Sequence, residues 1–144
     1  MPEKLAELSL SRIIQGQEAT AVVNRMHGKQ LEASEDVIGY YGKFHARNIL
    51  YVSAFETAEK AKANLMKMAT KMARGTKVFA PPTYDRMGDQ VGFKTSGMGF
   101  VHYFYRVDNV LIWWQVESEK ARSTYQALRA FDFSVLKAKA RHTQ

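Results

Sequence analysis

The sequence predicts an α+β fold in which a largely antiparallel sheet of about six strands carries helices packed on one face. Three segments, 18–26, 57–74 and 119–130, show apolar residues at helical spacing. Short β-prone runs separate them, and residues 90–117 contain three such runs joined only by turns. Because a meander of this kind breaks the alternation of strands and helices, a parallel doubly wound sheet is disfavoured.

Composition indicates one domain over residues 1–144. The chain is 46% hydrophobic and 12% aromatic, which is far from the composition of a disordered segment. It contains no cysteine, so disulfides, thiolate metal sites and a cysteine nucleophile are excluded. The net charge of +7 comes from residues 54–77, which contribute +4, and from 137–141, which contribute +3. We expect this basic tail, from about residue 137, to be frayed.

The first half of the chain predicts one helix among three strands. Residues 8–14 alternate loosely and form a first strand, which is followed by the helix at 18–26. A polar loop at 29–35 leads to two β-prone runs, 37–41 and 49–53. We expect those two runs to pair as a hairpin.

The clearest helix spans residues 57–74. Thr57 alone, or Ser53 with Glu56, can cap its start, and Gly75 ends it. An apolar stripe predicts its buried face: Ala58, Ala61, Leu65, Met68 and Met72. A basic stripe follows another face: Lys60, Lys67, Lys71 and Arg74. This basic stripe is either a solvated outer surface or a site for an anionic partner such as nucleic acid or an acidic membrane surface.

The second half predicts a short strand at 77–80, a loop at 84–89 and a strand at 90–95 that turns into the hairpin at 100–117. Ser118 is expected to cap the last helix, with Ala121, Tyr125 and Leu128 facing inward. Phe131, Phe133 and Val135 then dock as an extended segment.

The hairpin at 100–117 has two chemically different faces. A turn at Asp108 and Asn109 places Tyr103 opposite Trp114 on a face that is apolar throughout. The other face mixes large rings with polar heads: His102, Phe104, Arg106, Trp113 and Gln115. A fully buried face rarely carries so many polar groups, and a fully solvated face rarely carries so many rings. We therefore expect something to cover this mixed face at least in part.

Three different structures could cover the mixed face of the hairpin. The first is a helix or loop of the same chain, with the polar groups at its rim. The second is self-association into a homodimer, because aromatic residues and Arg are enriched at interfaces. The third is a ligand pocket with the rings as walls and His102, Arg106 and Gln115 as orienting groups.

Signatures of catalysis are sparse. The four histidines share no short metal-ligand spacing, and Gly97-Met-Gly99 matches only a fragment of a dinucleotide fingerprint between two strands. The sequence therefore predicts no metal and no cofactor, and it leaves the question of an enzyme open, with His102 as the candidate general base.

Four short motifs occur in order and are followed by a Met- and Lys-rich helix: Gly16-Gln-Glu-Ala19, Asn24-Arg-Met-His-Gly-Lys29, Tyr41-Gly42 and Leu50-Tyr-Val-Ser53. Over residues 14–117 this order resembles small uncharacterised bacterial proteins that are often exported behind a signal peptide or lipoprotein leader. It implies a single α+β domain of the cell envelope and a precursor longer than this chain, and it offers no catalytic residues. We expect a periplasmic or envelope location if a leader was removed, and a cytoplasmic one otherwise.

These observations favour a non-enzymatic binding or interaction domain, of the bacterial cell envelope, that uses the mixed face of the hairpin to contact a small molecule or a protein. The alternative is an anionic-surface binder acting through the basic stripe of 57–74. A small enzyme of unknown reaction is the third hypothesis.

Overall fold

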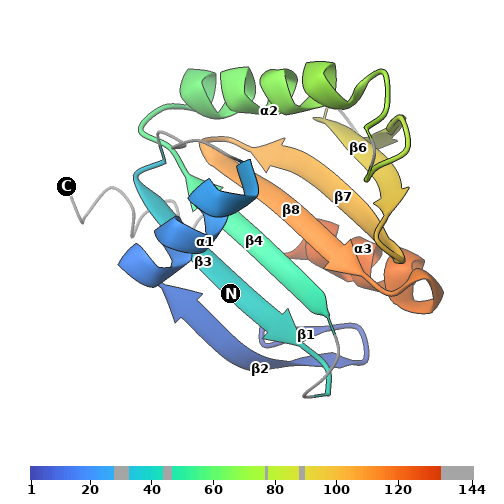
Figure 1. Cartoon of the computed structure of the whole chain (residues 1–144). Coiled ribbons are helices and arrows are strands. Elements are labelled where there is room, and N and C mark those ends of the chain that lie inside the picture. Colours follow the sequence, from blue (N-terminus) through green and yellow to red (C-terminus); the bar gives the residue numbers. More distant parts are fainter. Residues whose placement is uncertain (28–32, 44–46, 77, 88–89, 134–144) are drawn as a thin grey trace.

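The computed structural model describes residues 1–27, 33–43, 47–76, 78–87 and 90–133. These residues form one antiparallel sheet of eight strands, in the order β1-β2-β3-β4-β8-β7-β6-β5, together with three α-helices (Figure 1). The strands are β1 (Lys4–Leu5), β2 (Leu8–Gln15), β3 (Glu35–Tyr41), β4 (Asn48–Ala54), β5 (Thr83–Met87), β6 (Gln90–Gly97), β7 (Phe100–Val107) and β8 (Val110–Val116). The helices are α1 (Gln17–His27), α2 (Ala58–Met72) and α3 (Ala121–Ala130). No helix in the described part of the chain is long and apolar enough to cross a membrane.

The predicted α+β class and antiparallel sheet are confirmed, and the sheet is larger than the expected six strands. The two-residue β1 is too short to show an alternation, and β5 occupies a segment predicted to be a loop. The strand predicted at 77–80 is reduced to a single bridge between Phe79 and Gly97. The predicted frayed tail and the docking of Val135 lie outside the described residues.

The helices lie on both faces of the sheet, which corrects the prediction of one face. α1 and α2 cover one face, and α3 covers the other (Figure 1). The reason is that β8 is apolar on both sides. Ile112 and Trp114 point into the cluster under α3, while Leu111 and Trp113 point toward α2. Two apolar faces each need a covering layer to exclude water.

The hairpin of β7 and β8 has the predicted register. Tyr103 pairs with Trp114, and the pairing continues to Val107 and Val110 beside the turn. Asp108 provides the left-handed turn residue, with φ of 53°. The apolar face of this hairpin packs on α3, where the Tyr103 ring stacks on that of Tyr125 at 3.9 Å between centroids. The hairpin therefore lies in the interior of the sheet, and each of its two faces packs against one layer of helices.

The ends of α2 follow the sequence signals. The Thr57 hydroxyl oxygen accepts a hydrogen bond from the Lys60 amide at 3.1 Å, as a cap does. Gly75, with φ of 76°, follows the last turn. The helix buries Ala61, Leu65, Ala69 and Met72 against the sheet.

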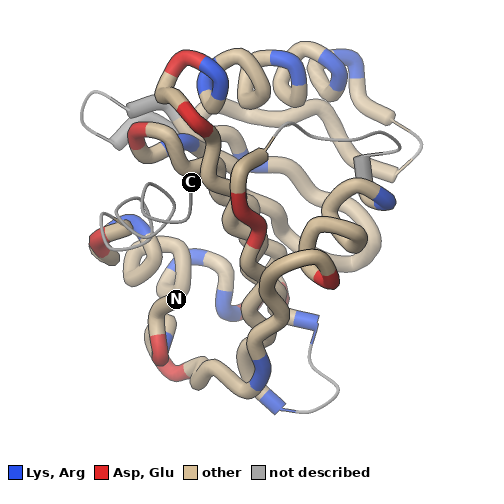
Figure 2. The backbone as a smooth tube through the Cα atoms, turned by 90° about the vertical axis from the view of Figure 1, so that its left-hand side faces the viewer, with Lys and Arg blue, Asp and Glu red and all other residues tan. Residues whose placement is uncertain are grey.

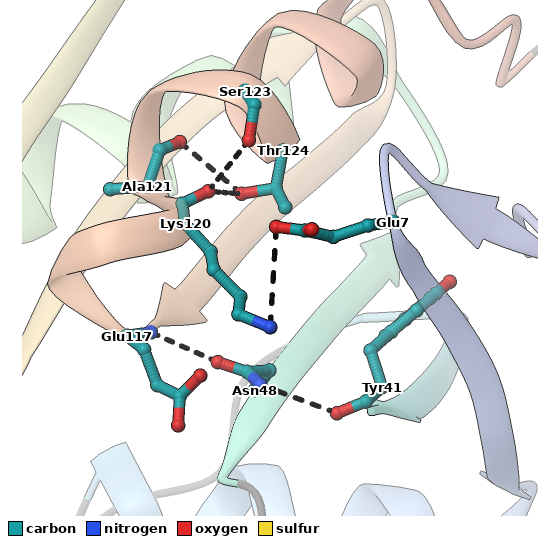
Figure 3. Close-up of polar contacts among 8 residues, drawn as sticks. All are labelled: Glu7, Tyr41, Asn48, Glu117, Lys120, Ala121, Ser123 and Thr124. Atoms are coloured by element: carbon teal, nitrogen blue, oxygen red, sulfur yellow. Dashed lines mark hydrogen bonds and ion pairs between the residues drawn. The ribbon is translucent and has the colours of Figure 1, made fainter. Parts of the chain in front are cut away.

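The start of α3 differs from the prediction. Ser118 makes no capping hydrogen bond, and the segment begins as a 3-10 turn over Ser118–Lys120. The Lys120 carbonyl instead accepts from the Thr124 hydroxyl at 2.6 Å (Figure 3). Nearby, the buried Asn48 donates to the Tyr41 carbonyl and accepts from the Glu117 amide, so that it ties β3 and β4 to the end of β8 (Figure 3).

Candidate ligand-binding cavity

A cavity of about 430 Å³ lies on the sheet face that α1 and α2 cover. Its floor comes from β4, β7 and β8: Tyr51, Ser53, His102, Leu111, Trp113 and Gln115. α1 contributes Val23 and Met26, and α2 contributes Met68, Lys71 and Met72. The segment after α2 and the turn between β6 and β7 supply the rest: Thr76, Val78, Phe79 and Met98.

The cavity exists because each helix covers only one side of this face. α1 packs over β2 and β3 through Val23 and Ala19, and α2 packs over Phe93 and Phe104 of the strands on the other side. Between them, β4 and β8 pair so that Tyr51 lies opposite Trp113, and both rings are only half-buried. β4 and β8 are therefore only partly covered by the two helices, and they form the floor of the cavity.

Gly97 allows the segment after α2 to close one side of the cavity. A Cβ atom at this position would clash with the Val78 carbonyl and the Phe79 ring, so this close approach requires glycine. The segment is held there by the Ala80 amide, which donates to the Ser96 carbonyl at 2.9 Å. Phe79 consequently lies edge-on to His102, with 4.9 Å between ring centroids.

The cavity has a buried inner end and an exposed apolar mouth. Val23, Met72 and Leu111 are buried at the inner end. At the mouth, Met26 is 48%, Val78 48% and Met98 66% exposed. Six large hydrophobic side chains are exposed in the described part of the chain, and three of them surround this mouth. Exposed apolar groups that gather at one place mark a binding surface.

His102 is neutral and fully engaged in the floor. The Trp113 indole N–H donates to its Nδ1 at 3.1 Å, and its Nε2 lies 3.1 Å from the Gly97 carbonyl. Because an indole nitrogen only donates, Nδ1 is the acceptor and the ring proton is on Nε2. Burial lowers the pKa of His102 below its ordinary value, and the bond to Gly97 only partly offsets this effect. Neither ring nitrogen has a free lone pair for a general-base role.

The remaining polar groups of the floor mostly bond to the protein itself. The Ser53 hydroxyl donates to the buried Asp36 carboxyl at 2.6 Å, and the Gln115 amide donates to the Arg47 carbonyl at 2.9 Å. Burial raises the pKa of Tyr51 to about 12, so this phenol is neutral at physiological pH. Lys71, which is exposed, is the one formally charged side chain of the described lining.

The structure brings three of the five predicted contact residues together and separates two. His102, Trp113 and Gln115 line the cavity. Phe104 is 0% exposed, stacked between Phe93 and Trp113 under α2, and therefore belongs to the core. Arg106 lies toward the hairpin turn, where it donates to the Asp108 carbonyl at 2.9 Å. The mixed face is thus covered in part by the same chain, and the rest of it borders the cavity or lies near the turn.

The basic stripe of α2 is also divided. Lys60 pairs with Glu56 at 2.5 Å, and this contact lowers the pKa of Glu56. Lys67 on α2 and Arg74 just after this helix are exposed and lie outside the cavity lining, whereas Lys71 lines the cavity. Basic positions recur along α2 at the top of Figure 2. One of the four stripe residues therefore belongs to the same site as the hairpin floor.

Several lining residues carried no functional signal in the sequence. Val23, Met26, Val78, Phe79 and Met98 come from three separate segments and form no motif. The close contact of Val78 and Phe79 with Gly97 brings these two residues to the cavity, where α1 supplies Val23 and Met26.

The described residues contain no group of three or more His, Asp or Glu side chains that could hold a metal ion. Comparisons with family models, with curated proteins and with solved structures find no match for this chain. The resemblance to exported bacterial proteins therefore stays a prediction.

Proposed function

We propose that this protein is a non-enzymatic binding domain that holds a small, largely apolar molecule in the cavity between α1 and α2. The observation that carries this proposal is the exposed apolar mouth, formed by Met26, Val78 and Met98 above a buried apolar interior. The volume of about 430 Å³ falls in the range of small-molecule sites. A folded protein leaves few such side chains together in water unless they meet a partner.

Four methionines line this cavity: Met26, Met68, Met72 and Met98. Methionine is unbranched and polarizable, so it adapts its shape to different apolar partners. This lining supports a site that accepts a range of apolar ligands of similar size. In this arrangement α1 and α2 supply flexible side chains, and the Trp113 ring of the floor lies among them.

A binding role is favoured over catalysis by the state of the polar groups. His102 is bonded at both ring nitrogens, and the described lining contains no Asp or Glu side chain. General acid and base chemistry needs a titratable group within reach of the substrate. The rings and the histidine are better suited to shape and orient a ligand than to react with it.

A pair of substitutions on α2 tests the proposal. Met68 lines the cavity and is half-buried, while Met66, two residues earlier, is exposed and lies outside it. We expect the neutral fluorescent probe 1-N-phenylnaphthylamine to bind the protein with increased emission. Met68→Glu should abolish this binding, because a carboxylate in the apolar wall is costly to desolvate.

Met66→Glu is the matched control and should bind the probe as the original chain does. Circular dichroism of both variants checks that they remain folded. Absence of probe binding to the unaltered protein, or equal loss in both variants, would count against the cavity as the site.

A second candidate function is binding to an acidic surface through α2. It is supported by Lys67 and Arg74, which are exposed and make no ion pair with any described residue. Binding to vesicles containing phosphatidylserine should weaken as salt rises, because ions screen such contacts. Lys67→Gln with Arg74→Gln should remove it; vesicle binding that persists in this double variant would exclude the basic stripe as its cause.

A further inference from the structure

We propose that the ligand is a single-chain amphiphile with an anionic head group, bound with its tail toward the buried floor and its head at Lys71. This inference rests on the proposed function of the cavity and adds the chemical class and the orientation of the molecule. It follows from how charge, hydrogen-bond donors and burial are distributed along the site.

The charge of the site is at its mouth. Lys71 is the one formally charged residue of the described lining, and it is exposed beside the apolar mouth residues. Lys67 lies one turn before Lys71 on α2, and Arg74 follows just after the end of this helix; both are exposed and add positive potential there. An anionic group placed at this end therefore meets favourable charge while it keeps contact with water.

The inner end repels an anion. Ser53 in the floor donates its hydroxyl to the buried carboxyl group of Asp36, its cross-strand neighbour on β3. A carboxylate or sulfate pushed to this end would approach that carboxyl and would lose its hydration. The arrangement fixes the polarity of the ligand, because the head is favoured only at the Lys71 end.

Most donors of the floor are already used within the protein; the half-buried Tyr51 hydroxyl is an exception, and it offers a buried head group a single hydrogen bond. The ring N–H of Trp113 is used by His102, and the proton of His102 is used by the Gly97 carbonyl. The buried lining around them is apolar, with Val23, Met72 and Leu111. A hydrocarbon tail suits such an apolar surface, whereas a charged head group there would find too few donors to replace its water.

The test compares three probes with the same twelve-carbon tail: laurate, which is anionic, dodecanol, which is neutral, and dodecyltrimethylammonium, which is cationic. Each is titrated below its micellar concentration into the full chain. Trp113, in the cavity floor, reports binding by its fluorescence, and the fully buried Trp114 on the opposite face gives a constant background. We expect laurate to bind most tightly and dodecyltrimethylammonium most weakly.

Two matched variants locate the head group. Lys71→Gln should weaken laurate by about fivefold, the effect of one exposed ion pair, and should leave dodecanol unchanged. Lys67→Gln removes a charge from the same stripe outside the cavity and should alter laurate affinity much less.

The outcomes separate this inference from the proposed function. Dodecanol binding with equal laurate affinity in the unaltered chain and Lys71→Gln would overturn the inference and leave the apolar site standing. An equal effect of Lys67→Gln and Lys71→Gln would also overturn it, because the preference would then arise from the general charge of α2. Failure of all three probes to bind would overturn both proposals.

Discussion

Acidification should destabilise the protein through His102. The pKa of this ring is lowered by burial from its ordinary value of 6.5. Between the folded-state value and 6.5 the unfolded chain binds the extra proton, so the free energy of unfolding falls as the pH falls. Above 6.5 both states are neutral and His102 contributes no slope. The loss should reach up to about 1.4 kcal/mol for each pH unit below 6.5 until the folded ring itself protonates.

Protonation is unfavourable here for a geometric reason as well. A proton on Nδ1 would face the Trp113 indole N–H, so two donors would oppose each other at 3.1 Å. Urea unfolding at a series of pH values measures the effect, with His102→Gln as control. The glutamine amide can accept from Trp113 and donate to Gly97, but it does not titrate. Because all other groups are common to both proteins, parallel stability curves below pH 6.5 would refute the reasoning.

Three further changes test the packing around the cavity by urea or thermal unfolding. Phe104→Ala should cost about 3 to 5 kcal/mol because the ring is fully buried, and a cost under about 1 kcal/mol would show that the ring is not core. Thr124→Val removes the acceptor of the buried Trp114 indole N–H and should cost about 1 to 3 kcal/mol; an unchanged stability would deny that hydrogen bond. Thr57→Ala should cost about 1 kcal/mol through loss of the α2 cap, whereas Ser118→Ala should stay within about 0.5 kcal/mol, and the reverse order would contradict the assigned helix starts.

The sequence predicted the hairpin of β7 and β8 well because its signals are local. The alternation of side chains and the turn at Asp108 determine which residues share a face, and the observed pairing has that register. The cap at Thr57 is equally local, since it needs only a hydroxyl and an amide three residues later. Such features depend on neighbours in the chain and on few tertiary contacts.

The position of the helices on the sheet could not be predicted from local sequence signals. The mixed face of the hairpin runs from His102 through Phe104 to Arg106, and only the placement of α2 decides which of them is covered. α2 lies over Phe104 and leaves His102 at the cavity, while Arg106 falls beyond it near the turn. Periodicity indicates that a helix has a buried face, but it does not say which strands this face will meet.

The cavity could not be predicted from the sequence, because its mouth is formed by residues that lie far apart in the chain. Met26 and Met98 are separated by half of the chain, and Val78 joins them only because Gly97 permits close approach of the segment after α2. Rings and polar heads alternate on the hairpin face, so the sequence indicates only that this face needs a cover. What covers it follows from tertiary packing of α1 and α2.

The most direct test of the ligand site is methionine methyl NMR of the protein titrated with laurate and with dodecanol. The chain has seven methionines, and four of them line the cavity: Met26, Met68, Met72 and Met98. Met1 packs in the cluster on the α3 face, and Met66 is exposed outside the cavity, so both serve as internal controls. We expect the four cavity methyl signals to shift in a saturable way while those of Met1 and Met66 stay in place. Unchanged cavity signals, or equal shifts of all methionines, would contradict a ligand site between α1 and α2.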